Sequence, residues 1–180
     1  MLTATINDYI LLMAEGLPGL YDDYCRHARL VDEIDLKGTQ GVVHFLAVKK
    51  RFDWPFLVVA QRYSPGGYAG FYPGVLLVPE THVLFIGAGT RLLAYQLDHP
   101  ERLWEDEADT GFWNWERHGE FVIMSAELEL AVWDIQGQKR WSTFVEPPWN
   151  YELVDDLIQL DVMGQQVSFP LNRGQTHPRQ

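Results

Sequence analysis

Short apolar runs alternate with Gly, Pro and charged residues from residue 41 onward. The clearest runs are GVVHFLAVKK (41–50), PFLVVAQRY (55–63), GVLLVPE (74–80) and HVLFIGA (82–88). They are rich in β-branched and aromatic residues, and their lengths are typical of β-strands. No helical pattern of useful length interrupts them before the C-terminus, which argues against βαβ folds. The pattern predicts a mainly β, antiparallel domain over residues 36–174.

The first 35 residues follow a different pattern. Four apolar positions fall at helical spacing: Ile6, Tyr9, Ile10 and Met13. Gly16 and Pro18 end this run. A second helix is predicted over about residues 19–33, where two Asp residues near its start suit the positive end of the helix dipole. We therefore expect a helical pair in residues 1–35, packed on the β domain.

Both parts are expected to belong to a single domain, residues 1–174. The last residues, 175–180, are polar and are expected to form a flexible tail.

A sequence repeat lies within the β region. HVLFIGAGTRLLAYQL (82–97) aligns with EFVIMSAELELAVWDI (120–135) at an offset of 38 residues, and DLIQLDVMGQQVSFPL (156–171) is a fainter third copy. Each copy is predicted to be a hairpin, in which Tyr95, Trp133 and Phe169 occupy equivalent buried positions. The first two copies continue into a strand that ends in Trp, ERLW (101–104) and QKRW (138–141).

A period near 38 residues with three or four short strands per unit is typical of propeller blades. The segments YQLDHPERLW and, more closely, WDIQGQKRW resemble the blades of PQQ-like (quinoprotein-type) β-propellers over about half the chain. The resemblance implies blade geometry only, without a cofactor or an enzyme activity. An antiparallel β-sandwich or meander of repeated hairpins is the expected fold, and a small propeller-like array of blades is the alternative.

The charge of the chain narrows its possible partners. It has 25 Asp and Glu against 14 Lys and Arg, a formal net charge of −11. Nucleic acid and anionic membrane surfaces are not expected as partners, because both bind clustered Lys and Arg. A basic protein or a neutral carbohydrate is electrostatically easier to bind.

The N-terminus and the cysteine count indicate a compartment. Cys25 is the single cysteine, which excludes an intrachain disulfide. No basic residue precedes the N-terminal apolar stretch, as a secretory signal would require. We therefore expect a soluble, cytoplasmic protein.

Paired carboxylates are the best candidates for catalysis. Glu127 and Glu129 lie at or beside the tip of the second predicted hairpin. Residues two apart share a strand face at about 7 Å, a separation that suits a general acid and base in glycoside hydrolysis. Glu146 is a third candidate, and ordinary solvated turn residues are the simpler interpretation. The six His residues show no ligand spacing, so neither a metal site nor a cofactor is expected.

Two connections between repeats combine Trp with acidic residues. The candidate binding residues are Trp113, Trp115, Glu116, Glu146, Trp149 and Tyr151. Trp113 and Trp115, two residues apart, are expected on one face of an extended segment. In EPPWNY (146–151), two prolines favour an extended surface crossing. Because both connections follow equivalent strands, we expect them to border one surface; the alternative is that these rings only close a core.

The sequence therefore favours a binding or interaction module with an aromatic–acidic surface. An acidic inhibitor or immunity-type protein that masks a basic partner fits the size and the charge. The alternative is a carbohydrate-active or other hydrolytic enzyme that uses Glu127, Glu129 or Glu146. An enzyme requires convergent carboxylates in a pocket, whereas a binding module requires an open patch of aromatic rings.

Overall fold

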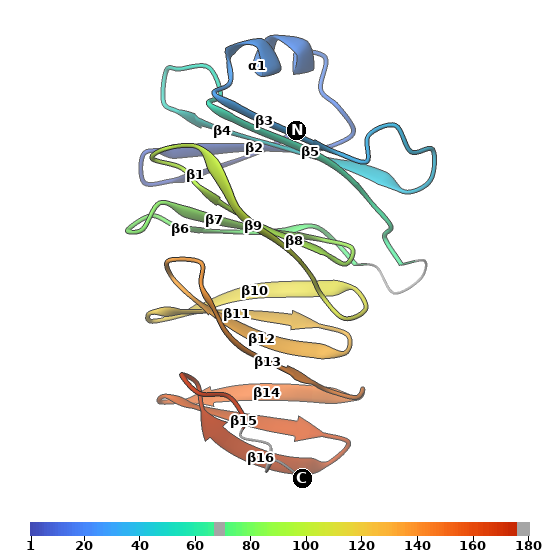
Figure 1. Cartoon of the computed structure of the whole chain (residues 1–180), viewed down its shortest axis with the longest axis vertical. Helices are drawn as coiled ribbons and strands as arrows, with labels where there is room; N and C mark the ends of the chain where they lie inside the picture. Colours follow the sequence, from blue (N-terminus) through green and yellow to red (C-terminus); the bar gives the residue numbers. More distant parts are fainter. Residues whose placement is uncertain (67–70, 176–180) are drawn as a thin grey trace.

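The strands of this chain form four small sheets in a row. The computed structural model describes residues 1–66 and 71–175; residues 67–70 and most of the expected tail, 176–180, lie outside this part. Within it, the sheets stack along the longest axis of the molecule (Figure 1). The first sheet has five strands, the second and third have four each, and the last has three. The chain is thus mainly β, as its apolar pattern predicts.

The first sheet contains β1 (Leu2–Ile6), β2 (Tyr9–Glu15), β3 (Leu30–Ile34), β4 (Val42–Lys50) and β5 (Leu57–Tyr63) in the order β1-β2-β4-β5-β3. The pair β3–β5 is parallel, and the other pairs are antiparallel. The single helix of the described residues, α1 (Tyr21–His27), lies over the outer face of this sheet, where its side chains pack against Phe45, Ala47 and Val58 (Figure 1).

The predicted N-terminal helical pair is wrong. Residues 2–15 form the hairpin β1–β2, which turns at Asn7 with a left-handed backbone (φ 51°). Three of the four positions that matched a helical period, Ile6, Tyr9 and Met13, also lie on the buried face of the hairpin, whereas Ile10 lies on the other face. Short segments of this kind fit both periods, and pairing with β4 decides for the strand.

The second predicted helix is confirmed only over residues 21–27. After Ala28, whose backbone is extended (φ −69°, ψ 148°), the chain continues as β3 beside β5. Three of the five residues of β3 are Leu, Val and Ile, types that fit a pleated, half-buried surface well. The first 35 residues are therefore a structural part of the first sheet and are not a helical addition to it.

Each remaining sheet is an antiparallel meander. The second contains β6 (Gly74–Val78), β7 (Val83–Ala88), β8 (Arg91–Gln96) and β9 (Glu101–Glu107). The third contains β10 (Phe112–His118), β11 (Phe121–Ala126), β12 (Glu129–Asp134) and β13 (Lys139–Phe144). The last contains β14 (Trp149–Val154), β15 (Leu157–Val162) and β16 (Gln165–Pro170). The expected meander of hairpins is present, but the sheets lie in one row and not as the two layers of a sandwich.

The three predicted hairpins are confirmed as β7–β8, β11–β12 and β15–β16. Tyr95, Trp133 and Phe169 pair with Leu84, Val122 and Ile158, which are the equivalent residues of the preceding strands. All three aromatic side chains are buried, and each belongs to the apolar layer that faces the preceding sheet.

One Trp residue joins the second sheet to the third, and another joins the third sheet to the last. The indole N–H of Trp104, on β9, donates to the carbonyl of Gly137 in the third sheet, at 2.5 Å. The indole N–H of Trp141, on β13, donates to the carbonyl of Leu171 beside the last sheet, at 2.6 Å. The two residues end the aligned segments ERLW and QKRW, so the repeat includes this contact as well.

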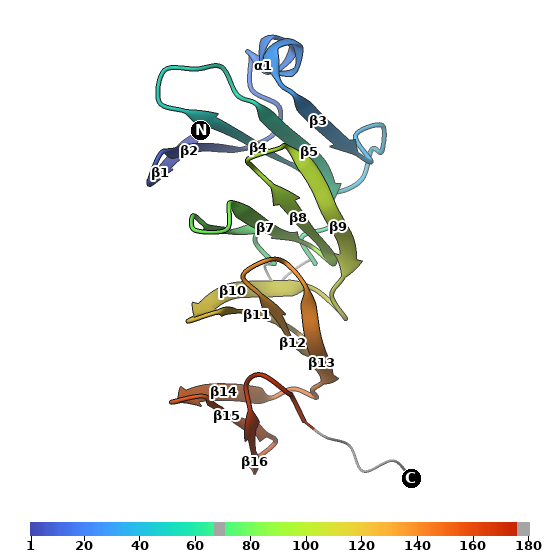
Figure 2. The same ribbon diagram turned by 60° about the vertical axis from the view of Figure 1, so that its left-hand side comes forward.

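The sheets are aligned so that their first strands share one side of the stack. β1, β6, β10 and β14 each pair with only one neighbour and lie at the edge opposite to β3, β9, β13 and β16 (Figure 2). We call this the first-strand side. Some side chains of these strands, such as Phe112 and Trp115, belong to the layers between sheets, whereas others, such as Trp113, are exposed on this side.

Two polar side chains lie inside the layer between the first and second sheets. His44 and Gln61 are paired across β4 and β5 and are buried, on the face that also carries Leu46 and Val59. Nδ1 of His44 and both amide atoms of Gln61 have no hydrogen-bond partner among the described residues. Burial lowers the pKa of the His44 imidazole from 6.5 to about 4, so the ring is neutral near pH 7.

This burial predicts a pH-dependent stability. Between pH 6.5 and about pH 4 the unfolded chain binds a proton at His44 that the folded chain does not bind. The free energy of unfolding should therefore fall as the pH is lowered through this window, by roughly 3 kcal/mol in all, and should be unaffected by His44 above it. Urea denaturation of the wild type and of His44→Leu measures the effect. Identical pH profiles of the two proteins would contradict it.

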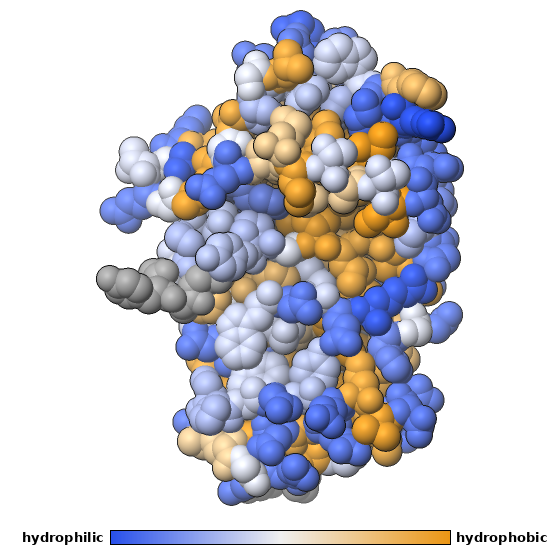
Figure 3. Space-filling model, turned by 180° about the vertical axis from the view of Figure 1, so that it is seen from behind, coloured by the Kyte–Doolittle hydropathy of each residue, from blue (hydrophilic) through white to orange (hydrophobic). Residues whose placement is uncertain are grey.

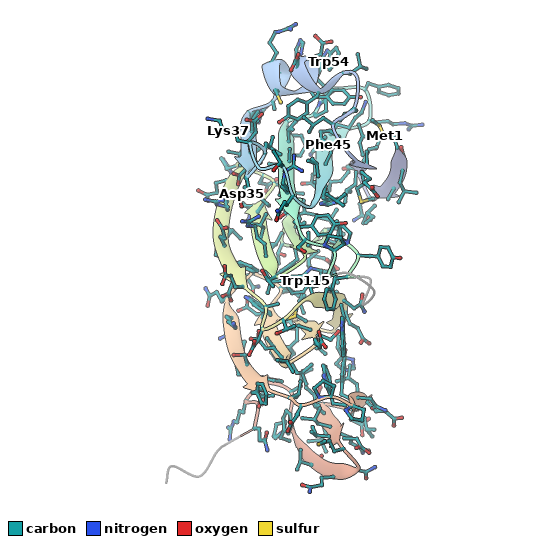
Figure 4. All side chains as sticks on the ribbon, turned by 90° about the vertical axis from the view of Figure 1, so that its right-hand side faces the viewer. Met1, Asp35, Lys37, Phe45, Trp54 and Trp115 are labelled. Carbon is teal, nitrogen blue, oxygen red and sulfur yellow. The ribbon has the colours of Figure 1, made fainter. Side chains whose placement is uncertain are left out.

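A second prediction concerns the core between the second and third sheets. Trp133 is 1% exposed and contacts the rings of Trp104 and Trp115. Trp133→Ala should lower the free energy of unfolding by roughly 3–5 kcal/mol, because it leaves a cavity in this layer. Trp54→Ala is the control, since Trp54 is 48% exposed at the helical end of the stack (Figure 4). Similar losses in both variants would show that Trp133 is not a core residue.

Candidate functional site

Most of the predicted binding residues meet on the first-strand side. Trp113 and Glu116 are on β10, and Trp149 and Tyr151 are on β14, the first strands of neighbouring sheets. Glu146 is exposed just before β14. In Figure 3, which looks onto this side, weakly polar side chains in pale colours gather over the lower half of the stack. The two connections are in contact, since Trp113 stacks on Trp149 and Tyr151 bonds Glu116; that they bind a partner stays a prediction.

Three aromatic rings form a stacked row between the third and last sheets. The ring centroids of Trp113 and Trp149 are 5.3 Å apart with an interplanar angle of 16°. Those of Trp149 and Tyr151 are 6.3 Å apart with an angle of 21°. Trp113 ends the row and is 43% exposed, whereas Trp149 and Tyr151 are partly buried against the last intersheet layer. The row thus presents one well-exposed indole to solvent.

Trp115 does not belong to this surface. It is 6% exposed and lies between the second and third sheets, in contact with the rings of Phe85, Phe112 and Trp133 (Figure 4). The expectation that Trp113 and Trp115 face the same way fails because the β10–β11 register shifts between Phe112 and Asn114. Trp113 is the extra residue of this bulge, and an extra residue reverses the alternation of the faces.

Hydrogen bonds hold the row in place. The Tyr151 hydroxyl donates to Oε2 of Glu116 at 2.7 Å, and the indole N–H of Trp149 donates to the backbone carbonyl of Glu127 at 2.9 Å. Burial, and then the bond to Glu116, raise the pKa of the Tyr151 phenol above its usual value. The phenol therefore remains a donor near pH 7.

The carboxylates around the row have no cationic partner. Within residues 1–66 and 71–175, no Lys, Arg or His forms an ion pair with Glu116, Glu127 or Glu146. Some acidic residues elsewhere are paired across sheets, for example Asp35 with Arg91 and Asp106 with Lys139. We call the three rings of Trp113, Trp149 and Tyr151, together with these three glutamates, the aromatic–acidic patch.

Glu127 and Glu129 lie in different surroundings. Glu129 is 8% exposed, and its Oε2 accepts the backbone N–H of Asp109 at 3.0 Å. Its Oε1 lies 3.5 Å from Nζ of Lys139. Glu127 is partly exposed on the other side of the hairpin tip, where its carbonyl contacts Trp149. The interpretation of both as solvated turn residues therefore holds for Glu127 alone, and Glu129 stabilises the fold.

The sequence indicated the Trp and acidic residues of the patch, but not the contact between Glu127 and Trp149. The position of Glu127 at a hairpin tip does not predict a contact with the sheet that follows. The bulge at Trp113 has no clear sequence signal either, since Phe112, Trp113 and Trp115 are all aromatic. Only pairing with β11 decides which of them is buried.

One pocket lies away from the patch. It has a volume of about 680 Å³ and lies beside the loop of residues 35–40, with Arg62, Tyr63 and Ser64 on its other wall. Asp35 and Lys37, both on this loop, lie at the opposite edge of the stack from β1 (Figure 4). The pocket is open, and its charged groups are of both signs, so the geometry does not select a ligand. The patch itself is an open surface.

Among the described residues, no group of three or more His, Cys, Asp or Glu side chains could hold a metal ion. In the same part of the chain, no helix has the length and apolar character needed to cross a membrane.

Comparisons with known proteins reveal only distant similarity. No family model matches the chain, and no curated protein matches it. The structure is similar to Myxococcus xanthus glutaminyl cyclase, with a TM-score of 0.34 and 12% identity, over 82% of this chain and 69% of that one. It is also similar to Kluyveromyces lactis Hsv2, with a TM-score of 0.29 and 12% identity, over 53% of this chain and 36% of that one. The chain spans little more than a third of the Hsv2 chains that it matches.

The different surroundings of the two hairpin glutamates give a prediction. Glu129→Gln should lower the free energy of unfolding by about 1–2 kcal/mol, because it weakens a buried, charge-assisted contact with the Asp109 N–H and removes the charge near Lys139. Glu127→Gln should change it by less than about 0.5 kcal/mol. Chemical denaturation of both variants measures the difference. Equal effects would contradict the placement of Glu129.

Proposed function

We propose that this chain is a binding module that takes a cationic partner on its aromatic–acidic patch. A basic protein is the partner class that fits best, as for an acidic inhibitor or immunity-type protein. We infer further that the stacked sheets are blades of a small, open, propeller-like array, with the patch on the side of its first strands. The blades serve as a rigid support, so no step of chemistry is assigned to them.

The unpaired carboxylates around the stacked rings carry this proposal. Glu116 accepts the Tyr151 hydroxyl, the backbone of Glu127 accepts the Trp149 indole N–H, and Glu146 is exposed three residues before Trp149. The net charge of −11 adds a long-range attraction for cations. Aromatic rings beside carboxylates are effective anchors at protein interfaces, because rings supply contact area with few rotatable bonds and carboxylates orient a cation.

The alternative, a carbohydrate-active or other hydrolytic enzyme, has less support. Glu129 is already bonded to Asp109 and near Lys139, and Glu146 is on an exposed segment. General acid–base catalysis needs two carboxyl groups directed at one enclosed position. A neutral carbohydrate that binds without being cleaved remains a possible outcome of the experiment below.

Binding to peptides of graded net charge tests the proposal. The probes are cationic, neutral and anionic peptides of equal length, together with neutral oligosaccharides, measured by calorimetry at low and high salt. The cationic peptides should bind most tightly, and their affinity should fall as the salt concentration rises. Binding of an oligosaccharide without salt dependence would instead support the carbohydrate alternative, and failure of every cationic peptide to bind would refute the proposal.

A triple variant locates the binding surface. Glu116→Gln, Glu127→Gln and Glu146→Gln together should weaken binding of the cationic peptide by about tenfold or more. The matched control changes Glu101, Glu120 and Glu152 to Gln; these residues are exposed, and none forms an ion pair with a described residue. Both variants change the net charge equally. Equal weakening by both would mean that only the overall charge attracts the peptide.

A further inference from the structure

The exposed indole of Trp113 offers a single ring face to a ligand. Its inner face is covered by Trp149 at a centroid distance of 5.3 Å, and no other described aromatic ring contacts it. At 43% exposure, the indole still has a large accessible area. The site can therefore receive one group against this ring.

We propose that the outer face of Trp113 binds an arginine side chain of the partner, with its guanidinium stacked on the indole and directed at the carboxylates of the patch. This inference rests on the proposed function and adds to it the identity of the anchoring group. Trp113 is then a residue that determines specificity for arginine over lysine.

The bulge in β10 places Trp113 for this role. Phe112 and Trp115, on either side, both point into the layer between the second and third sheets. In a regular strand, alternation would place Trp113 and Trp115 on the same face. The bulge reverses this at one position, so one indole leaves the core and reaches Trp149 of the next sheet. Bulges commonly redirect a side chain in this way beside a binding site.

The hydrogen bonds of the patch favour a cation over a neutral ligand. The indole N–H of Trp149 is already bonded to the Glu127 carbonyl, and the Tyr151 hydroxyl to Glu116, so these two donors are in use. Oε1 of Glu116 forms no hydrogen bond with a described residue, and Glu127 and Glu146 have no cationic partner among the described residues. The free groups of the patch are therefore its carboxylate acceptors, one aromatic face and a single donor, the indole N–H of the exposed Trp113.

Arginine matches these two features better than lysine does. Its guanidinium is planar, weakly hydrated and able to stack on an indole while its N–H groups bond carboxylates at the edge. The ammonium of lysine is compact and strongly hydrated, and it cannot cover a ring face while it forms two parallel bonds. A surface that used charge alone would not distinguish the two side chains.

Three forms of one peptide test the inference. The probe is the tightest cationic peptide from the charge-graded series, labelled for fluorescence anisotropy. It is prepared with arginine, with lysine at every arginine position, or with citrulline, the neutral isostere of arginine. Each form is titrated with the full-length wild type, with Trp113→Leu and with Trp54→Leu. Trp54 is the control because it is another indole with similar exposure, 48%, at the far end of the stack.

The arginine peptide should bind the wild type about tenfold more tightly than the lysine peptide, and the citrulline peptide should bind most weakly. Trp113→Leu should remove the preference for arginine over lysine, and Trp54→Leu should retain it. The inference is overturned if the wild type binds the arginine and lysine peptides equally, or if Trp113→Leu keeps the preference. Either result leaves the proposed function intact, since that function fails only when no cationic peptide binds.

Discussion

Burial of apolar side chains between successive sheets is the interaction on which this structure depends. A sheet of three or four strands cannot bury either of its faces alone, and each sheet here obtains its core from its neighbours. Three separate apolar layers result, built around Tyr95, Trp133 and Phe169. Each sheet is therefore stabilised by the layers that it shares with its neighbours. The indole bonds of Trp104 and Trp141 also join the second sheet to the third and the third sheet to the last.

The same principle requires the two ends of the row to be covered differently from its middle. At one end, α1 lies on Phe45 of the first sheet (Figure 4). At the other end, the outer face of the last sheet carries mostly polar residues: Asn150, Glu152, Gln159, Gln166 and Ser168, all exposed. Polar outer faces are what terminal units of a stacked array need to remain soluble. These ends do not present the apolar faces that would close the row into a ring.

What the sequence could predict follows from the range of the interactions involved. The hairpins around Tyr95, Trp133 and Phe169 repeat a local pattern, so comparison of segments finds them. Most of the helix-spaced apolar positions of the β1–β2 hairpin around Asn7 also fit a strand, and only pairing with the distant strand β4 decides between the two. Trp113 and Trp115 were assigned to one face for a related reason. A bulge depends on the register of the partner strand, and a single sequence does not contain it.

The position of the aromatic–acidic patch also follows from the stack. Because the cores lie between sheets, the first strands can also carry exposed side chains, such as Glu116 and Trp113. The patch nevertheless crosses a sheet boundary, since Glu116 is on β10 and Tyr151 is on β14. A partner bound across it would therefore hold the last, three-stranded sheet against the third. Binding and the stability of the last sheet are then linked, because a ligand stabilises whichever arrangement it requires.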